Sequence, residues 1–564
     1  LGHCECWSFV WCACLSVPSI TPGASRATAR IFKRNRERKK TRKKKKSTNM
    51  SGHKLEETTD IAKFFAGKSV FLTGITGFLG KVLLEKMLRS CPDIGNIFVL
   101  IREKKGQKGR DRLKQILNEV LFERVQKVHP EALSKVQVVA GDLLQPELGM
   151  SNSDRERLTR EVSVVIHGAA SVRFDEPLRF SVRSNIAATK MILDLCHEMK
   201  NLKVYVHVST AYCNCNEKEI REEVYPTHMK PANLMNIAEW MDDSLLEAIT
   251  PKLIKDRPNT YTYTKAVAEQ LVQEASSTLP VTIIRPSIIT GAWKEPLEGW
   301  VDNYNGPTGL LIALGKGVLK TVYTDLQMSA DLIPVDMVSN NVLAAAWYRG
   351  SGRSQKLLVY NMTSGADNPL TWQEFMTHTW EIPYNYPSSI ILRYPQPRCT
   401  HSKLLHRLRM FFQHYLPAQT FDVALRAVGR KPMLSRLYDK VKNNMDLFEY
   451  FTTTEWYFHN DNVRALYSEM SPKDKEEFNF DVKTLDWKEY LFNYCMGIRK
   501  YLLKEELDTL PEAQRHLTKL YIVSKAGNML LMLGAWRFIK AVAFDPVDIV
   551  YNMGSYFQEF VDTL

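Results

Sequence analysis

A glycine-rich turn near the start of the chain lies between a short apolar run and an amphipathic segment. Residues 69–73 are typical of a buried strand, and Gly74-Ile-Thr-Gly-Phe-Leu-Gly80 follows at once. The next ten residues place four apolar side chains on one helical face: Leu83, Leu84, Met87 and Leu88. Strand, glycine turn and helix in this order predict a cradle for a pyrophosphate at the helix N-terminus. A Walker-type P-loop is excluded because Lys81 is followed by Val82.

The turn and the strand after it supply the first candidate residues of a dinucleotide site. Cofactor contacts are expected along the turn at Thr73, Gly74, Thr76, Gly77, Phe78, Leu79 and Gly80. Arg102 follows the predicted strand 96–101, where NAD enzymes usually carry an acid roughly 20 residues after the glycines. Because arginine suits a ribose 2′-phosphate through bidentate hydrogen bonds, we predict NADP(H); a solvated loop charge is the alternative.

Further β-rich runs alternate with helical stretches over the next 200 residues or so. They span residues 136–140, 162–166, 204–208 and 281–284. The alternation predicts an α/β fold with a doubly wound parallel sheet of the Rossmann type, which binds ligands at its strand C-termini. The residues at those ends complete the cofactor candidates: Asp142, Leu143, Gly168, Ala169, Pro286 and Ser287. His167 is interpreted as a packed histidine rather than a catalyst.

A tyrosine and a lysine form the candidate reactive centre. Tyr261 and Lys265 open a predicted helix, and their i, i+4 spacing sets them on one face. A nearby ammonium group, helped by the cationic nicotinamide, is expected to lower the pKa of the tyrosine from about 10. Tyr263 is the rival tyrosine, but it faces away from the lysine. Thr210 supplies a hydroxyl for a substrate carbonyl, with Ser209 as the alternate, and no metal is expected.

With these residues in view, the chain resembles the extended short-chain dehydrogenase/reductases and, more narrowly, the alcohol-forming fatty acyl-CoA reductases of eukaryotes. The likeness runs from about residue 66 to about residue 503. The glycine turn and the Tyr/Lys pair are common to the whole superfamily. Segments 299–309 and 333–336 and the C-terminal region narrow the likeness. The family's tyrosine and lysine map onto Tyr261 and Lys265, and its active hydroxyl residue maps onto Thr210.

The resemblance implies an NADPH-dependent reduction of long-chain fatty acyl-CoA to a primary alcohol through a bound aldehyde, with release of coenzyme A. In that reaction Thr210 and Tyr261 stabilise the oxyanion, Tyr261 supplies the proton, and Lys265 also contacts the cofactor. Two other classes stay open. One is an extended reductase or epimerase that acts on a nucleotide sugar or sterol, and the other is a nucleic-acid-binding or scaffold protein on a retired Rossmann fold.

Charge and composition divide the chain into a basic leader and a balanced body. Residues 1–49 carry thirteen Lys and Arg against two Glu, or +11 of the formal +14, so no nucleic-acid partner is expected for the folded body. The chain starts at Leu1 and its first methionine is Met50, so we expect residues 1–49 to be a disordered leader. Six later cysteines show no paired spacing, which indicates a reducing compartment.

The remaining residues are predicted to form three parts. Residues 50–385 form the NADP-binding Rossmann and substrate-binding domain, residues 386–510 a smaller, mainly helical domain, and residues 511–564 an amphipathic tail. Oligomeric state leaves no signal in the sequence.

Membrane attachment is expected at the surface of a bilayer. No stretch approaches the roughly 18 consecutive apolar residues of a spanning helix. Residues 403–415 combine an apolar side with Lys403, Arg407 and Arg409, which suits an anionic membrane surface; packing against the body is the alternative. Residues 526–536 are free of charge but too short to span. We expect the cytosolic face of an endoplasmic reticulum or peroxisome membrane, with integral insertion left open.

Overall fold

The computed structural model describes residues 58–562. The predicted leader, residues 1–49, therefore lies outside the described residues, and its disorder stays a prediction.

Seven parallel strands form the central sheet. They are β1 (Ser69–Thr73), β2 (Ile97–Ile101), β3 (Val136–Ala140), β4 (Val162–His167), β5 (Val204–Val208), β7 (Val281–Pro286) and β11 (Val359–Met362). Their order across the sheet is β11-β7-β5-β4-β1-β2-β3, and every neighbouring pair is parallel. The chain thus winds outward in both directions from β1, which confirms the predicted doubly wound Rossmann-type sheet.

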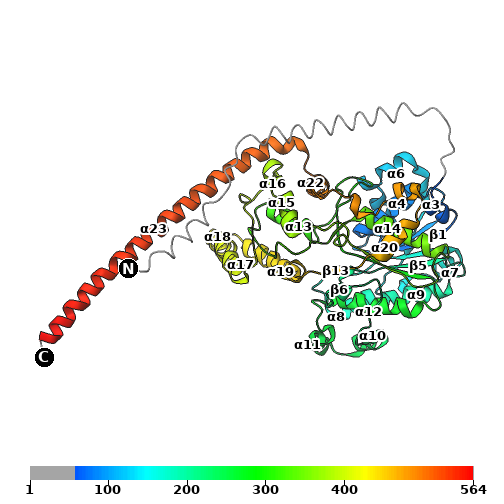
Figure 1. The fold of residues 1–564 in the computed structure, drawn as a ribbon, viewed down its shortest axis with the longest axis horizontal. Coiled ribbons are helices and arrows are strands. Elements are labelled where there is room, and N and C mark those ends of the chain that lie inside the picture. The colour runs from blue at the N-terminus through cyan, green and yellow to red at the C-terminus, as the bar shows by residue number, and fades with distance from the viewer. Residues whose placement is uncertain (1–57, 563–564) are drawn as a thin grey trace. The chain divides into compact units, whose positions relative to one another are not determined.

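Helices cover both faces of this sheet, and they account for the unbroken apolar runs of its central strands. Helices α4 and α14 lie on one face, and α9 and α12 lie on the other (Figure 1). The helices of this half are α3 (Asp60–Phe65), α4 (Phe78–Ser90), α5 (Gly109–Leu117), α6 (Glu123–Val128), α7 (Asn152–Glu161), α8 (Leu178–Ser181), α9 (Ala188–Glu198), α10 (Pro231–Trp240), α11 (Asp243–Ile254), α12 (Thr260–Ala275), α13 (Pro307–Gly315) and α14 (Val335–Gly350).

The C-terminal part is mainly helical, as predicted. Its helices are α15 (Trp372–Thr379), α16 (Ile382–Asn385), α17 (Lys403–Met410), α18 (Leu416–Ala427), α19 (Leu434–Thr452), α20 (Asp461–Glu469), α21 (Pro472–Glu477), α22 (Trp487–Gly497) and α23 (Leu510–Asp562). Three π-helical segments are η4 (Val182–Ala187), η6 (Phe411–Tyr415) and η8 (Ile498–Leu502). Short 3₁₀ turns are η1 (Val120–Phe122), η2 (Pro130–Lys135), η3 (Pro146–Gly149), η5 (Ala211–Asn214), η7 (Val482–Thr484) and η9 (Leu507–Thr509).

Two-stranded pairings join segments that are far apart in the sequence. They connect β8 (Ile288–Thr290) with β10 (Leu332–Pro334), β9 (Thr321–Tyr323) with β12 (Arg398–Thr400), and β6 (Glu219–Ile220) with β13 (Tyr457–Phe458). The last two pairings tie the C-terminal part to residues 321–323 and 219–220, whereas the predicted domain boundaries stay predictions.

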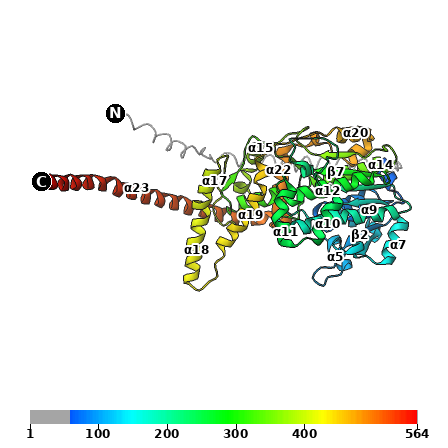
Figure 2. The same cartoon turned by 90° about the horizontal axis from the view of Figure 1, so that it is seen from below.

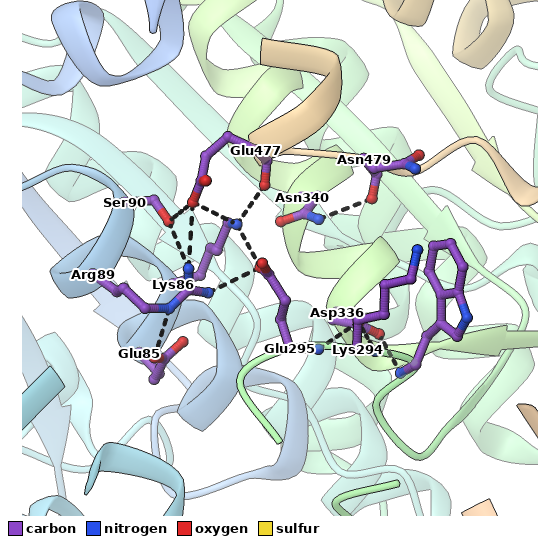
Figure 3. Close-up of polar contacts among 11 residues, drawn as sticks. Glu85, Lys86, Arg89, Ser90, Lys294, Glu295, Asp336, Asn340, Glu477 and Asn479 are labelled. Atoms are coloured by element: carbon purple, nitrogen blue, oxygen red, sulfur yellow. Dashed lines mark hydrogen bonds and ion pairs between the residues drawn. The ribbon is translucent and has the colours of Figure 1, made fainter. Parts of the chain in front are cut away.

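A cluster of charged side chains also ties the C-terminal part to the first Rossmann helix (Figure 3). Lys86 of α4 lies 2.6 Å from a carboxylate oxygen of Glu295 and donates a hydrogen bond to the carbonyl oxygen of Glu477. Arg89 contacts both carboxylates, at 2.9 and 3.3 Å, and also pairs with Glu85 one turn earlier in α4. Because Lys86 and Arg89 are nearly inaccessible to solvent, removing one partner would leave an uncompensated buried charge.

Helices α17 and α18 lie beside α19 and apart from the seven-stranded sheet in both views (Figures 1 and 2). Within residues 58–562, no helix has both the length and the apolar content needed to cross a membrane.

Candidate active site

The glycine turn after β1 leaves no room for side chains. Gly74 has a φ of +87°, and a Cβ built on it would lie 2.8 Å from the backbone nitrogen of Ala169. A Cβ on Gly80 would lie 2.2 Å from the carbonyl oxygen of Gly74. The turn therefore packs backbone to backbone against helix α4 and against the loop at Gly168 and Ala169. Gly74 is required because its φ is positive and because neighbouring backbone lies too close for a side chain, and Gly80 is required for the second reason alone.

The open side of the same turn suits an anion. Helix α4 begins at Phe78, and its N-cap, Gly77, offers no side chain to the first backbone N–H groups. Thr76 and Gly77 are exposed, and Phe78 and Leu79 are half-buried. The first backbone N–H groups of this 13-residue helix have no side-chain acceptor, and no Cβ atom of the turn covers them. Such N–H groups at a helix N-terminus fit the pyrophosphate of a dinucleotide.

Buried polar contacts hold the two loops of this cradle together. Thr73 Oγ1 lies 2.8 Å from Nδ1 of His167 and accepts a hydrogen bond from the backbone N–H of Ala169. The other ring nitrogen of His167 lies 3.2 Å from Oγ1 of Thr189, and burial lowers the pKa of this histidine to about 3. The side chains of Thr73 and His167 therefore make their hydrogen bonds within the protein. His167 is a packed, neutral histidine, as interpreted from the sequence.

Two candidates for the adenosine end of the cofactor lie side by side at the ends of β2 and β3. Arg102 and Asp142 form an ion pair at 3.8 Å, and both remain accessible, at 50% and 30%. Asp142 also accepts a hydrogen bond from the N–H of Leu144, and Leu143 between them is half-buried. The guanidinium group of Arg102 therefore stands at the same sheet edge as the glycine turn, exposed and within reach of a ligand.

Pro286 and Ser287 lie at the end of β7, the neighbour of β5. Pro286 is the last residue of the strand, and the N–H of Ser287 donates to the carbonyl oxygen of Met362 at the end of β11. Both residues therefore lie at the carboxyl edge of the sheet, on the side opposite β2 and β3.

Tyr261, Lys265 and Thr210 meet at the end of β5. Asn259 caps helix α12, which starts at Thr260, so Tyr261 lies in its first turn and Lys265 one turn later. The side chain of Thr210 hydrogen-bonds to the hydroxyl of Tyr261. The ammonium group of Lys265 donates to the carbonyl oxygen of Val208 at 2.6 Å. The structure thus brings together the three groups that the sequence analysis singled out.

The lowered pKa that the sequence analysis expected for Tyr261 is not found in the protein without its cofactor. Burial raises the pKa of this phenol above its usual range, and the hydrogen bond from Thr210 only partly offsets that increase. Burial also lowers the pKa of Lys265 to about 8. A raised pKa keeps Tyr261 protonated at neutral pH, which suits a proton donor.

The two rival residues have different surroundings. Tyr263 is fully buried in the core between the sheet and α12, where its ring stacks on His228 at 5.6 Å, so it faces away from Lys265 as predicted. Ser209 is buried, and its hydroxyl has no hydrogen-bond partner among the described residues. Thr210 is therefore the hydroxyl that contacts Tyr261.

The sequence analysis missed Asn185, a polar residue beside this centre. Asn185 lies in the π-helical segment η4, and its side chain donates to Oγ1 of Thr264 and accepts from the N–H of Ser171. It thereby joins the loop after β4 to helix α12. π-Helical turns are frequent at functional sites, but no sequence pattern marks them.

Aromatic side chains of the C-terminal part cover one side of the site. The ring of Phe174 lies 5.7 Å from that of Tyr261 and 5.8 and 5.4 Å from those of Phe448 and Phe451 in helix α19. Phe451 in turn contacts Tyr212 in the segment after Thr210. Phe174, Phe448 and Phe451 therefore form an aromatic wall beside Tyr261.

Within residues 58–562, no three or more His, Cys, Asp or Glu side chains are grouped so that they could hold a metal ion.

The chain is similar to known proteins along most of its length. A family model described as "Male sterility protein" matches residues 72–342, and a second model with the same description matches residues 413–505. Fatty acyl-CoA reductase 1 of Xenopus laevis is 46% identical over 505 residues, which cover 88% of this chain and 98% of that protein. The human proteins named fatty acyl-CoA reductase 1 and 2 are 43% and 41% identical, and these matches also cover 88% of this chain and 98% of each relative.

A solved structure shows a similar fold. The terminal R domain from the myxalamid PKS-NRPS biosynthetic pathway superposes with a TM-score of 0.50 at 20% identity, covering 77% of this chain and 91% of that domain.

Proposed function

This chain belongs to the fatty acyl-CoA reductases, and from that premise we propose that it uses NADPH to reduce long-chain fatty acyl-CoA thioesters to primary alcohols. The observation that carries the proposal is the meeting of Tyr261, Thr210 and Lys265 at the sheet edge that also holds the glycine cradle. This membership favours an acyl-CoA substrate over the nucleotide sugar or sterol of the first alternative. An intact site in an enzyme family also argues against a scaffold protein.

The residues support a reductive mechanism. Bound NADPH supplies the hydride. The hydroxyls of Thr210 and Tyr261 lie next to one another and can both donate to the substrate carbonyl oxygen, which stabilises the negative charge that develops there. Tyr261 then gives its proton to that oxygen, and the ammonium group of Lys265 favours the phenolate left behind. A thioester needs two such reductions to become a primary alcohol, with coenzyme A leaving after the first.

The aromatic wall beside Tyr261 is the proposed contact surface for the acyl chain. Phe174 and Phe448 are half-buried and lie beside Tyr261, whereas Phe451 behind them is almost fully buried. An apolar chain attached to the carbonyl carbon at Tyr261 would remove these rings from water, which is favourable in proportion to the area covered.

Product analysis tests the proposed reaction. The protein is incubated with NADPH and acyl-CoAs of mixed length, and the lipids and oxidised cofactor are quantified. We expect a primary alcohol, one free coenzyme A and two oxidised cofactors for each acyl-CoA consumed. Turnover of a UDP-sugar with no acyl-CoA reduction would contradict the proposal.

Arg102 is proposed to select NADPH through the 2′-phosphate. Its exposed guanidinium lies where an NAD enzyme would carry an acid, and charge-assisted hydrogen bonds of this type contribute about 1.5–3 kcal/mol. We expect Arg102→Ala to raise the KM for NADPH at least about tenfold and to leave the KM for NADH unchanged. Steady-state kinetics with both cofactors measures this, with Arg110→Ala, an exposed arginine of α5, as the matched control. An equal loss with both cofactors would show that Arg102 only shapes the loop.

We also propose that the continuous helix of α17, η6 and α18 (Lys403–Ala427), which we call the basic helix, binds a membrane surface. Leu404 is 69% exposed and Phe412 is 60% exposed, so much of the basic helix's apolar side is not packed against the body. Arg407 is exposed beside them. Exposed apolar side chains next to arginine suit the interface of an anionic bilayer. The location proposed is the cytosolic face of an endoplasmic reticulum or peroxisome membrane.

Vesicle binding tests the role proposed for the basic helix. We expect Leu404→Ser combined with Phe412→Ser to weaken co-sedimentation with phosphatidylserine-containing vesicles at least about tenfold, because two large apolar groups no longer enter the bilayer. Trp240→Ser in α10, 71% exposed in the Rossmann half, is the matched control and should bind as the wild type does. Binding of the double variant equal to that of the wild type would exclude the basic helix as the attachment site.

A further inference from the structure

A second buried histidine, His207, lies directly behind Lys265. It is fully buried in β5, one residue before the carbonyl group that accepts the hydrogen bond from Lys265. Its Nε2 atom lies 3.4 Å from Nζ of Lys265, and its Nδ1 atom lies 3.3 Å from the hydroxyl of Tyr205. The sequence analysis assigned this histidine no role.

The chemistry of these contacts fixes how His207 is protonated. An ammonium group has only donors, so the ring nitrogen that faces Lys265 has to be the acceptor. The proton of the neutral ring is then on Nδ1 and points to the oxygen of Tyr205. Burial and the charge of Lys265 hold the pKa of His207 well below its usual range, so the ring stays neutral at physiological pH.

We propose that His207 is a positioning residue for the reductase reaction, which acts as a neutral acceptor to hold the Lys265 ammonium group beside Tyr261. The proposal rests on the proposed function, because it assigns the charged form of Lys265 to the active enzyme. Val208 provides the shorter hydrogen bond to Lys265, and His207 provides the second acceptor in a site that is almost closed to water. Tyr205 acts through His207, because its oxygen can accept the Nδ1 proton and so stabilises the ring form that the contact with Lys265 requires.

The other charged and titratable groups around Lys265 come from four elements. Glu269 lies one turn further along α12 and favours the ammonium form, but Arg285 of β7 binds both of its carboxylate oxygens at 2.9 and 2.6 Å. The thiol of Cys213 in η5 donates to the same carboxylate. His167 of β4 lies beside the ring of His207 and is neutral. Only the His207 side chain is both neutral and an acceptor for Lys265 among these groups.

The pH profile of the reaction tests the proposal. Because burial places the pKa of Lys265 near 8, wild-type kcat should fall as the pH rises through about 8, when the ammonium group is lost. His207→Leu removes an acceptor of the charged form, so the ammonium group becomes easier to deprotonate. We expect its alkaline limb to move to lower pH by about one pH unit, a tenfold change in the acid dissociation constant. His207→Gln, which keeps an acceptor oxygen, should restore most of that shift.

Two further variants separate positioning from folding. His167→Leu makes the same change in the neighbouring strand, where the histidine contacts Thr73 and Thr189 instead of Lys265. We expect it to weaken NADPH binding and to leave the alkaline limb where it is in the wild type. Tyr205→Phe keeps the shape of the core and should move the limb in the same direction as His207→Leu, by a smaller amount. This variant keeps the test decisive if His207→Leu does not fold.

Nitrogen NMR of ¹⁵N-histidine-labelled protein provides a readout that needs neither substrate nor cofactor. With the signals of His207 assigned by their loss in His207→Gln, we expect a protonated Nδ1 and an unprotonated Nε2 between pH 6 and pH 9. A proton on Nε2, or an alkaline limb that is the same in the wild type, Tyr205→Phe and His207→Leu, would overturn the proposal. Failure of wild-type acyl-CoA reduction would instead refute the proposed function, while the NMR result would still report on the contact.

Discussion

Tyr261→Phe is expected to lower kcat for acyl-CoA reduction by about 10²–10⁴-fold, because the variant lacks both the proton donor and one donor to the developing oxyanion. The ring, its contact with Phe174 and the glycine cradle all remain. The affinity for NADPH should therefore stay within about twofold of the wild-type value, as measured by fluorescence titration.

Tyr263→Phe is the matched control for this experiment. Tyr263 lies two residues away in the same helix, and its buried hydroxyl has no hydrogen-bond partner among the described residues. Removing that hydroxyl should leave kcat unchanged and should not lower the melting temperature. If Tyr261→Phe kept wild-type kcat, or Tyr263→Phe lost it, the assignment of the proton donor would be wrong.

Gly80→Ala should weaken NADPH binding at least about 100-fold, or about 2.7 kcal/mol. Its Cβ would lie 2.2 Å from the carbonyl oxygen of Gly74 and 2.7 Å from the carbonyl carbon, so the turn and helix α4 have to separate. That separation moves the N–H groups that face the pyrophosphate. Calorimetric titration with NADPH measures the loss, and circular dichroism shows whether the sheet is intact.

Gly315→Ala is the control for Gly80→Ala. Gly315 ends helix α13, and a Cβ there would meet only the side chain of Pro383 at 3.7 Å, an ordinary contact. This variant should bind NADPH as the wild type does. Wild-type affinity in Gly80→Ala would show that the turn does not hold the cofactor.

The sequence predicted those parts of the fold and the site that depend on residues close together in the chain. Apolar runs of four to six residues predicted most of the central strands, and β1, β3 and β5 begin and end where predicted. Helix α4 begins three residues earlier than the predicted amphipathic run, because the last glycine of the turn is already helical. The Tyr261 and Lys265 pair could be predicted because an i, i+4 spacing survives in any helix.

The parts that the sequence could not supply depend on contacts between distant segments. Asn185 acts through a π-helical turn, and Phe448 reaches the site only because α19 folds back beside the loop of Phe174. The sequence shows His207 only as one residue of a buried strand, and its contact with Lys265 is visible only in the structure. The pKa of Tyr261 was predicted in the wrong direction for the protein alone, because burial raises this pKa and the ammonium group of Lys265 does not offset the rise.

A crystal structure of the protein with NADPH and a non-reducible acyl-CoA analogue tests the central claim most directly. We predict that the pyrophosphate lies at the N-terminus of α4 and that the nicotinamide lies beside Lys265. The carbonyl oxygen of the analogue should be within hydrogen-bonding distance of the hydroxyls of both Tyr261 and Thr210. A nicotinamide bound away from these three residues, or a carbonyl group that reaches neither hydroxyl, would contradict the account.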